Sequence, residues 1–155
     1  MAIEIERKFL VRSNRWRDLV QPGKRYQQGY LWSDPVRTVR ARIAGDRAFL
    51  TIKGQTDGLA RSEYEYEIPV IDATEMLATL CVSPPIDKVR YRLPCAEGCW
   101  EIDEFFGSNA GLIVAEIELD RPDRPVQLPD WIGEEVSHDP RYRNSALADR
   151  PFSTW

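Results

Sequence analysis

Residues 3–11 place two carboxylates and an ammonium group where they can act together. The segment alternates like a β-strand, so Glu4, Glu6 and Lys8 share one face. Neighbouring carboxylates repel each other unless a cation lies close to both. We therefore expect Glu4 and Glu6 to face either a divalent metal ion or basic side chains on other strands.

Other segments repeat this pattern of charged pairs at a spacing of two residues. A solvated outer face explains any one of them. Together they are unusual, because the charged faces carry few uncharged polar groups and each segment is mainly acidic or mainly basic. The acidic pairs are Glu63 with Glu65, Glu101 with Asp103 and Glu116 with Glu118, and the basic pairs are Arg40 with Arg42 and Lys88 with Arg90, with Lys53 beside Thr51.

The alternating segments predict eight β-strands. They cover residues 3–11, 25–32, 36–43, 47–53, 61–70, 87–93, 99–106 and 112–120. If their apolar faces pack outward, the charged faces line a common interior. The expected fold class is α+β and mostly β: an eight-stranded antiparallel β-barrel with a few short flanking helices.

Short helices are expected at three places. Asn14 can cap a helix that runs to Val20, residues 72–75 resemble a capping box that opens a second helix, and the third covers residues 144–148. Three prolines make residues 121–131 irregular.

An interior of this kind suits a polyanion and a hard cation. Arginine binds phosphate oxygens in bidentate fashion, and carboxylates hold Mg²⁺ or Mn²⁺. Phosphoryl transfer needs mainly positioning and neutralisation of charge, which these residue types supply.

Composition narrows the remaining possibilities. The 155 residues predict one domain, and the net charge of -4 argues against a nucleic-acid surface. The sequence begins with a charged segment and contains no apolar run of membrane-spanning length, so we expect no secretory signal and no membrane span. Three cysteines without a disulfide pattern are typical of a cytoplasmic protein, and the single His138 excludes histidine-based metal sites.

The ordered motifs resemble the CYTH superfamily, the triphosphate tunnel metalloenzymes, over nearly the whole chain. Glu4-x-Glu6-x-Lys8 is similar to the ExExK signature of that family. Further blocks follow in the family's order: Gln-Gly-Tyr at 28–30, Arg40-x-Arg42, Lys53, Arg61-x-Glu63-x-Glu65, Lys88-x-Arg90, residues 101–105 and residues 111–119. Short bacterial members that begin in this way are mostly inorganic triphosphatases.

The resemblance implies a role for each charged residue. Substrate phosphates would be bound by Lys8, Arg40, Arg42, Lys53, Arg61, Lys88 and Arg90. The principal metal, Mg²⁺ or Mn²⁺, would be held by Glu4, Glu6, Glu116 and Glu118, while Glu63, Glu65 and Asp103 would help to place a second ion or a water. Tyr30 and Lys88 would activate the attacking water. The expected activity is metal-dependent hydrolysis of tripolyphosphate to pyrophosphate and phosphate, in a cytoplasmic protein that can form a homodimer.

Other activities stay open from the sequence. Adenylate cyclase and thiamine triphosphatase activities occur on the same fold and need space for an organic group. A non-catalytic polyphosphate-binding module would keep the cations but does not need the four glutamates. The proline-rich segment departs from relatives that carry a helix there, and Arg141, Tyr142 and Arg143 can serve either closure of the tunnel or substrate contact.

Overall fold

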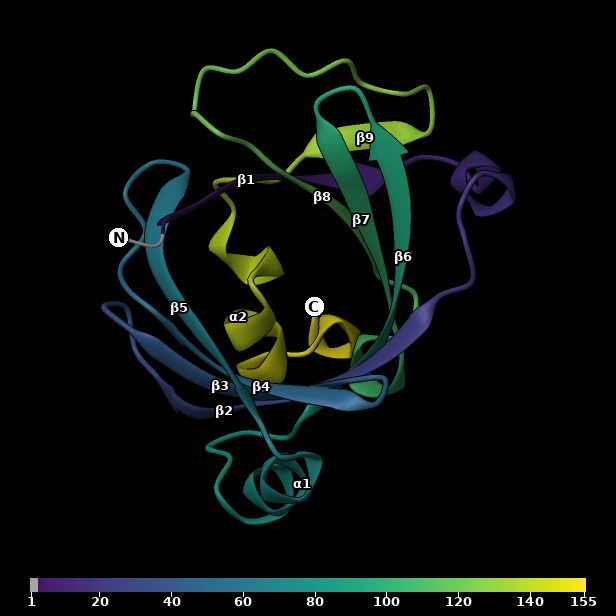
Figure 1. Ribbon diagram of the computed structural model, residues 1–155. Coiled ribbons are helices and arrows are strands. Elements are labelled where there is room, and N and C mark those ends of the chain that lie inside the picture. Colours follow the sequence, from purple (N-terminus) through teal and green to yellow (C-terminus); the bar gives the residue numbers. More distant parts are fainter. Residues whose placement is uncertain (1–2) are drawn as a thin grey trace.

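A computed structural model describes residues 3–155, and its central feature is a closed antiparallel β-barrel (Figure 1). Eight strands follow each other around the barrel in the order β5-β4-β3-β2-β6-β7-β8-β1, and pairing of β1 with β5 closes it. The strands are β1 Ile3–Val11, β2 Lys24–Ser33, β3 Thr38–Ala44, β4 Arg47–Lys53, β5 Ala60–Ile68, β6 Ile86–Cys95, β7 Gly98–Phe105 and β8 Ile113–Glu118. The eight predicted strands and the predicted barrel are confirmed.

A ninth strand was not predicted. Strand β9, Ile132–Glu135, pairs with the end of β1 that β5 leaves free. It is only four residues long and carries two glutamates, so its sequence does not show a clear alternation.

The helices are short and lie at the outside and at one opening of the barrel. Helix α1, Val70–Thr79, lies outside β2, β3 and β4, whereas α2, Asn144–Asp149, lies within the outline of the barrel (Figure 1). Four 3₁₀ turns complete the fold: η1 Arg15–Asp18, η2 Gly107–Asn109, η3 Pro140–Tyr142 and η4 Phe152–Thr154. None of the helices between residues 3 and 155 combines the length and apolar character needed to cross a bilayer.

Two predicted helix starts are wrong in detail. The segment after Asn14 forms only a 3₁₀ turn, and the Asn14 side chain makes no capping hydrogen bond. Helix α1 begins two residues before Asp72, after Pro69, so residues 72–75 lie inside the helix and do not cap it. Pro69 occupies the position before the helix, and no side chain caps this end by a hydrogen bond.

Two apolar clusters are found in the described residues: one beneath α2, with Val114 and Leu147 among its members, and one outside the barrel wall. Phe9, Trp100 and Ile117 point outward from β1, β7 and β8 and pack against Trp16 and Trp131. The ring of Trp100 meets those of Phe9 and Trp131 edge to face, at centroid distances of 5.6 and 5.7 Å. The proline-rich segment forms no helix or strand, as predicted. Trp131 at its end packs into this outer cluster, so that an irregular segment covers the outside of the wall.

Gly29 allows α1 to approach the barrel closely. A Cβ atom at this position of β2 would collide with the Cys81 sulfur and would lie 3.0 Å from Leu77 Cδ2. The glycine therefore permits close packing between the wall and the end of α1, on the side away from the charged faces.

We expect Gly29→Ala to destabilise the protein by about 1–3 kcal/mol, because the added methyl group overpacks this contact. Thermal unfolding measures the effect. Gly54→Ala is the control, since a Cβ there meets Ser62 at an ordinary distance of 3.4 Å. Equal stability of the two variants would contradict the packing role of Gly29.

Candidate functional site: a charged tunnel inside the barrel

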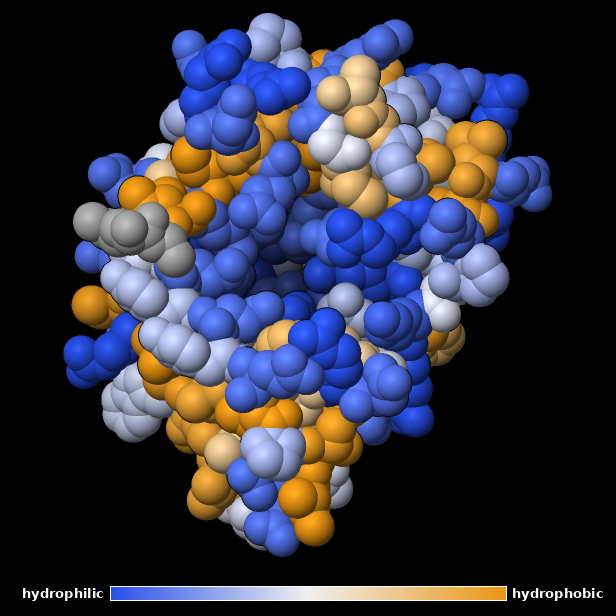
Figure 2. Space-filling view, in the orientation of Figure 1, coloured by the Kyte–Doolittle hydropathy of each residue, from blue (hydrophilic) through white to orange (hydrophobic). Residues whose placement is uncertain are grey.

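The charged faces line one polar cavity of about 260 Å³ inside the barrel. The space-filling view shows a hollow at the centre of the molecule surrounded by hydrophilic residues (Figure 2). Antiparallel pairing brings this about, because side chains in register on one face of neighbouring strands point to the same side. The predicted site residues that line the cavity are Glu4, Glu6, Lys8, Tyr30, Arg40, Arg42, Lys53, Arg61, Glu63, Glu65, Lys88, Arg90, Glu116 and Glu118.

Asp103 is the exception, because it lies below the surface of the cavity. It is 1% exposed, and its carboxylate accepts hydrogen bonds from Lys88 Nζ at 2.7 Å and from Arg90 Nε at 2.7 Å. Burial alone would raise the pKa of Asp103, but Arg90 and Lys88 outweigh it and hold this pKa well below its usual range. Both oxygens are engaged, so the structure supports a role in positioning two cations more directly than a role in holding an ion.

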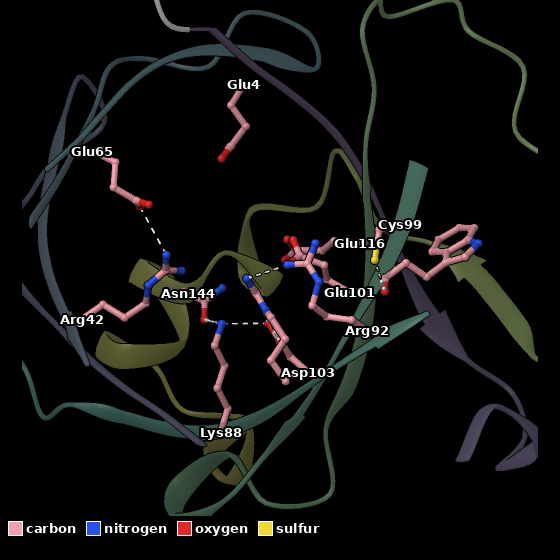
Figure 3. A network of polar contacts seen from close by, with 12 residues as sticks. Glu4, Arg42, Glu65, Lys88, Arg92, Cys99, Glu101, Asp103, Glu116 and Asn144 are labelled. Carbon is pink, nitrogen blue, oxygen red and sulfur yellow. Dashed lines mark hydrogen bonds and ion pairs between the residues drawn. The ribbon is translucent and has the colours of Figure 1, made fainter. Parts of the chain in front are cut away.

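Lys88 is the most deeply buried cation of the site. Its Nζ also donates to Asn144 Oδ1 at 3.1 Å, and burial lowers the pKa of Lys88 to about 8 despite the charge of Asp103 (Figure 3). The lysine is thus held between two acceptors at the bottom of the cavity.

Two arginines on β3 share one carboxylate. Glu65 lies 3.7 Å from Arg40 and 3.3 Å from Arg42, and Arg40 also donates to Thr51 at 3.3 Å. Burial and the nearby Arg40 and Arg90 lower the pKa of Arg42 to about 10. The Nε atoms of both arginines are buried without a partner in the part of the chain that the structure describes. The positive charge of the two arginines on this wall favours an anionic ligand.

Lys53 on β4 and Lys8 on β1 each form ion pairs with glutamates of other strands. Lys53 Nζ lies 2.9 Å from Glu4 and 3.1 Å from Glu63. Burial would raise the pKa of Glu4, yet Lys53 lowers it to about 2, whereas burial raises that of Glu63 to about 7. Lys8 lies 3.4 Å from Glu116 and donates to the backbone oxygen of Tyr142 at 3.1 Å.

Glu6 on β1 lies opposite Glu118 on β8 in the strand register, and other carboxylates lie close to both. Burial, followed by repulsion from Glu116 and Glu4, raises the pKa of Glu6 to about 8. Burial and the charge of Glu4 likewise raise the pKa of Glu118. Carboxylates in this condition suit a hard divalent cation, which removes the repulsion.

The four glutamates Glu4, Glu6, Glu116 and Glu118 are therefore suitable oxygen ligands for a metal ion, but their side chains do not converge on a single point. Within residues 3–155, no three acidic, His or Cys side chains converge closely enough to form a metal cluster. Glu4 and Glu116 are engaged by Lys53 and Lys8, so metal binding requires these lysines to give way.

The C-terminal segment lines the cavity as well. Arg143, Asn144 and Ser145 face it from the start of α2, and Tyr142 contributes its backbone oxygen. Tyr142 itself is buried and Arg141 is exposed beside Asp139, so these two side chains belong to the closing structure.

Sequence reasoning missed several residues of the cavity wall. Glu101 and Arg92 belong to charged faces already recognised, and Thr51 shares a face with Lys53, so their alternation was an available signal. The same signal applies to Tyr26, in step with Tyr30, and to Thr38, in step with Arg40. The other residues lie in loops or the closing segment, where no strand alternation marks them: Thr56, Gly58, Leu59, Ser137, Arg143, Asn144 and Ser145.

A closed antiparallel barrel with an ionic interior defines a tunnel protein that binds a small polyanion. The CYTH domain model matches residues 2–147, and the chain belongs to the CYTH domain family.

Similar proteins support this assignment over the full length. An inorganic triphosphatase of Acetivibrio thermocellus is 46% identical over 155 residues, with 100% of this chain and 99% of the relative covered. An inorganic triphosphatase of Nitrosomonas europaea is 37% identical over 150 residues, covering 94% and 96%. The crystal structure of the inorganic triphosphatase NE1496 is similar with a TM-score of 0.64 and 34% identity, covering 96% of this chain and 95% of that one.

The burial of Glu6 next to other carboxylates predicts a pH-dependent gain in stability for Glu6→Gln. The folded-state pKa is about 8 and the reference value is 4.5, so folding becomes less favourable as pH rises between them. Glutamine lacks this penalty. In the presence of a chelator, we expect the melting temperature of the variant to exceed that of the parent at pH 8.5, by about 2–4 °C per kcal/mol.

The gain should disappear near pH 4, where the carboxyl group is protonated in both states. Glu134→Gln on the exposed part of β9 is the control, since it makes the same chemical change in water. A difference between Glu6→Gln and the parent that is independent of pH would contradict the buried repulsion.

Proposed function

We propose that this chain is a metal-dependent inorganic triphosphatase that hydrolyses tripolyphosphate to pyrophosphate and phosphate inside the barrel. The observation that carries the proposal is that Arg40 and Arg42, which keep buried Nε donors without a partner in the described residues, line the same cavity as Glu6 and Glu118, whose pKa values are raised. A ligand that brings negative oxygens to one wall and a divalent cation to the other satisfies both. The activity named for the full-length relatives agrees with this chemistry.

Binding and orientation are assigned to the cations of the cavity. Arg40, Arg42 and Lys53 lie on β3 and β4, and Lys8 and Arg90 lie on β1 and β6, so a linear anion can be held from several sides. Arg61 extends this wall: burial lowers its pKa, although the charge of Glu4 opposes the shift. Fixed cations on several strands hold the phosphoryl groups in line without reorganisation during the reaction.

The metal would be held by Glu4, Glu6, Glu116 and Glu118, with Glu63 and Glu65 beside the cations. When bound, Mg²⁺ or Mn²⁺ neutralises charge on the phosphoryl oxygens and favours attack by water. We assign Asp103 to the positioning of Lys88 and Arg90, in place of the ion-binding role expected from the resemblance.

Activation of the water is assigned to Tyr30 and Lys88. Tyr30 is 5% exposed and lines the same cavity as Lys8. Lys88 is fixed between Asp103 and Asn144. These two residues can orient a water or receive its proton at the buried end of the site.

A homodimer and a cytoplasmic location stay predictions from the family resemblance. Sedimentation of the purified chain tests the first and fractionation of the source cell the second.

The proposed activity predicts phosphate release from tripolyphosphate with Mg²⁺ or Mn²⁺ and its loss with a chelator. The same panel includes ATP, with detection of cyclic AMP, and thiamine triphosphate. Preference for an organic triphosphate would replace the proposal by one of the other activities of the fold. Tight binding of tripolyphosphate without turnover of any compound would indicate a binding module.

Arg40→Gln should lower kcat/KM for tripolyphosphate by about 10²-fold or more, as expected for loss of one electrostatic donor. Arg47→Gln is the matched control: Arg47 belongs to the neighbouring strand β4, but its side chain is 59% exposed and pairs with Glu67 outside the cavity. If both variants retain the parent activity, Arg40 does not bind the reacting substrate.

A further inference from the structure

The closing segment supplies a polar group to the cavity that neither the charge pattern nor the strand alternation indicates. Asn144 is the first residue of α2, the helix that lies within the barrel outline (Figure 1). Its side chain lines the cavity. It belongs to a segment more than fifty residues after Lys88 in the sequence, yet the two side chains are in direct contact.

The contact with Lys88 determines how the Asn144 amide is oriented. A lysine ammonium group has donors only, so the atom that faces it must be the oxygen. Lys88 Nζ lies 3.1 Å from Asn144 Oδ1, and Figure 3 shows the amide nitrogen on the side away from Lys88. Asp103, which binds the same ammonium group at 2.7 Å, holds Lys88 in place.

Gln28 reinforces this orientation from the other side. It is fully buried on β2, and its Nε2 donates to Asn144 Oδ1 at 3.0 Å. The Oε1 atom of Gln28 has no partner within the described residues. A buried, unpaired amide oxygen is unfavourable, because it has lost its hydrogen bonds to water without replacing them. The amide of Gln28 is therefore kept for the hydrogen bond that it donates.

Because Lys88 Nζ and Gln28 Nε2 both donate to Asn144 Oδ1, the Nδ2 amide group of Asn144 is available to a ligand in the cavity. We propose that Asn144 is a further substrate-binding residue, whose Nδ2 donates to a phosphoryl oxygen at the end of the tunnel covered by α2. Gln28 is a positioning residue that prevents the amide from rotating by 180°. A rotated amide would direct its oxygen, and not its donors, at the anion.

This inference rests on a phosphate-containing ligand, the substrate class of the proposed function, but it does not need turnover. It predicts that binding of tripolyphosphate, measured by calorimetry with a chelator present, weakens by at least about tenfold in Asn144→Asp. The aspartate keeps an acceptor for Lys88 and Gln28 but replaces the donors with a second oxygen. Where turnover occurs, KM should rise more than kcat falls.

Asn14→Asp is the matched control, because it makes the same change in net charge at an exposed position outside the barrel. It should bind tripolyphosphate like the parent. Unchanged binding by Asn144→Asp, with a melting temperature near that of the parent, would overturn the proposal.

Gln28→Leu separates orientation from contact. Leucine removes the donor to Asn144, so binding should weaken several-fold in the parent. In the Asn144→Asp background the same change should have little effect on binding, because both oxygens of a carboxylate are acceptors. An equal loss in both backgrounds would overturn the positioning role of Gln28. Absence of turnover with these binding differences intact would refute the triphosphatase proposal alone.

Discussion

Transfer of a charged side chain from water into a protein interior is unfavourable by several kcal/mol unless opposite charges or hydrogen bonds replace the water. The barrel imposes this condition on many residues at once, because β1 closes it against β5 and the charged faces of the strands then share one interior. The paired groups, such as Asp103 with Lys88 and Arg90, meet the condition within the chain. The remaining charges depend on what enters the tunnel.

Charged residues of the cavity that are fully paired within the chain have a structural role, whereas those without sufficient opposite charge are the ones proposed to bind ligand. Asp103 uses both oxygens on cations and is among the most buried side chains. Glu6, in contrast, has a raised pKa because it is buried and because Glu116 and Glu4 lie nearby. Buried charges that lower the stability of the protein on its own are stabilised when a ligand of opposite charge binds. Part of the folding stability is therefore exchanged for binding.

Strand alternation was sufficient to predict the barrel and most of the cavity wall, because a period of two assigns each side chain to a face. It could not assign depth: Asp103 shares the polar face of Glu101 yet lies below the cavity surface. Contacts between distant segments were also hidden. Asn144 meets Gln28 and Lys88 only through the path of the C-terminal segment, for which no local pattern in the sequence exists.

The position of β1 has a consequence for how the chain folds. This strand precedes the other described strands in the chain, but it pairs with β5, β8 and β9, and β8 begins at Ile113. Pairing over such sequence separations raises contact order and slows folding. The strand that carries Glu4, Glu6 and Lys8 therefore leaves the ribosome long before its partners on β8 and β9 exist. Its high charge then has a second use, since a charged edge resists pairing with the wrong strand during that interval.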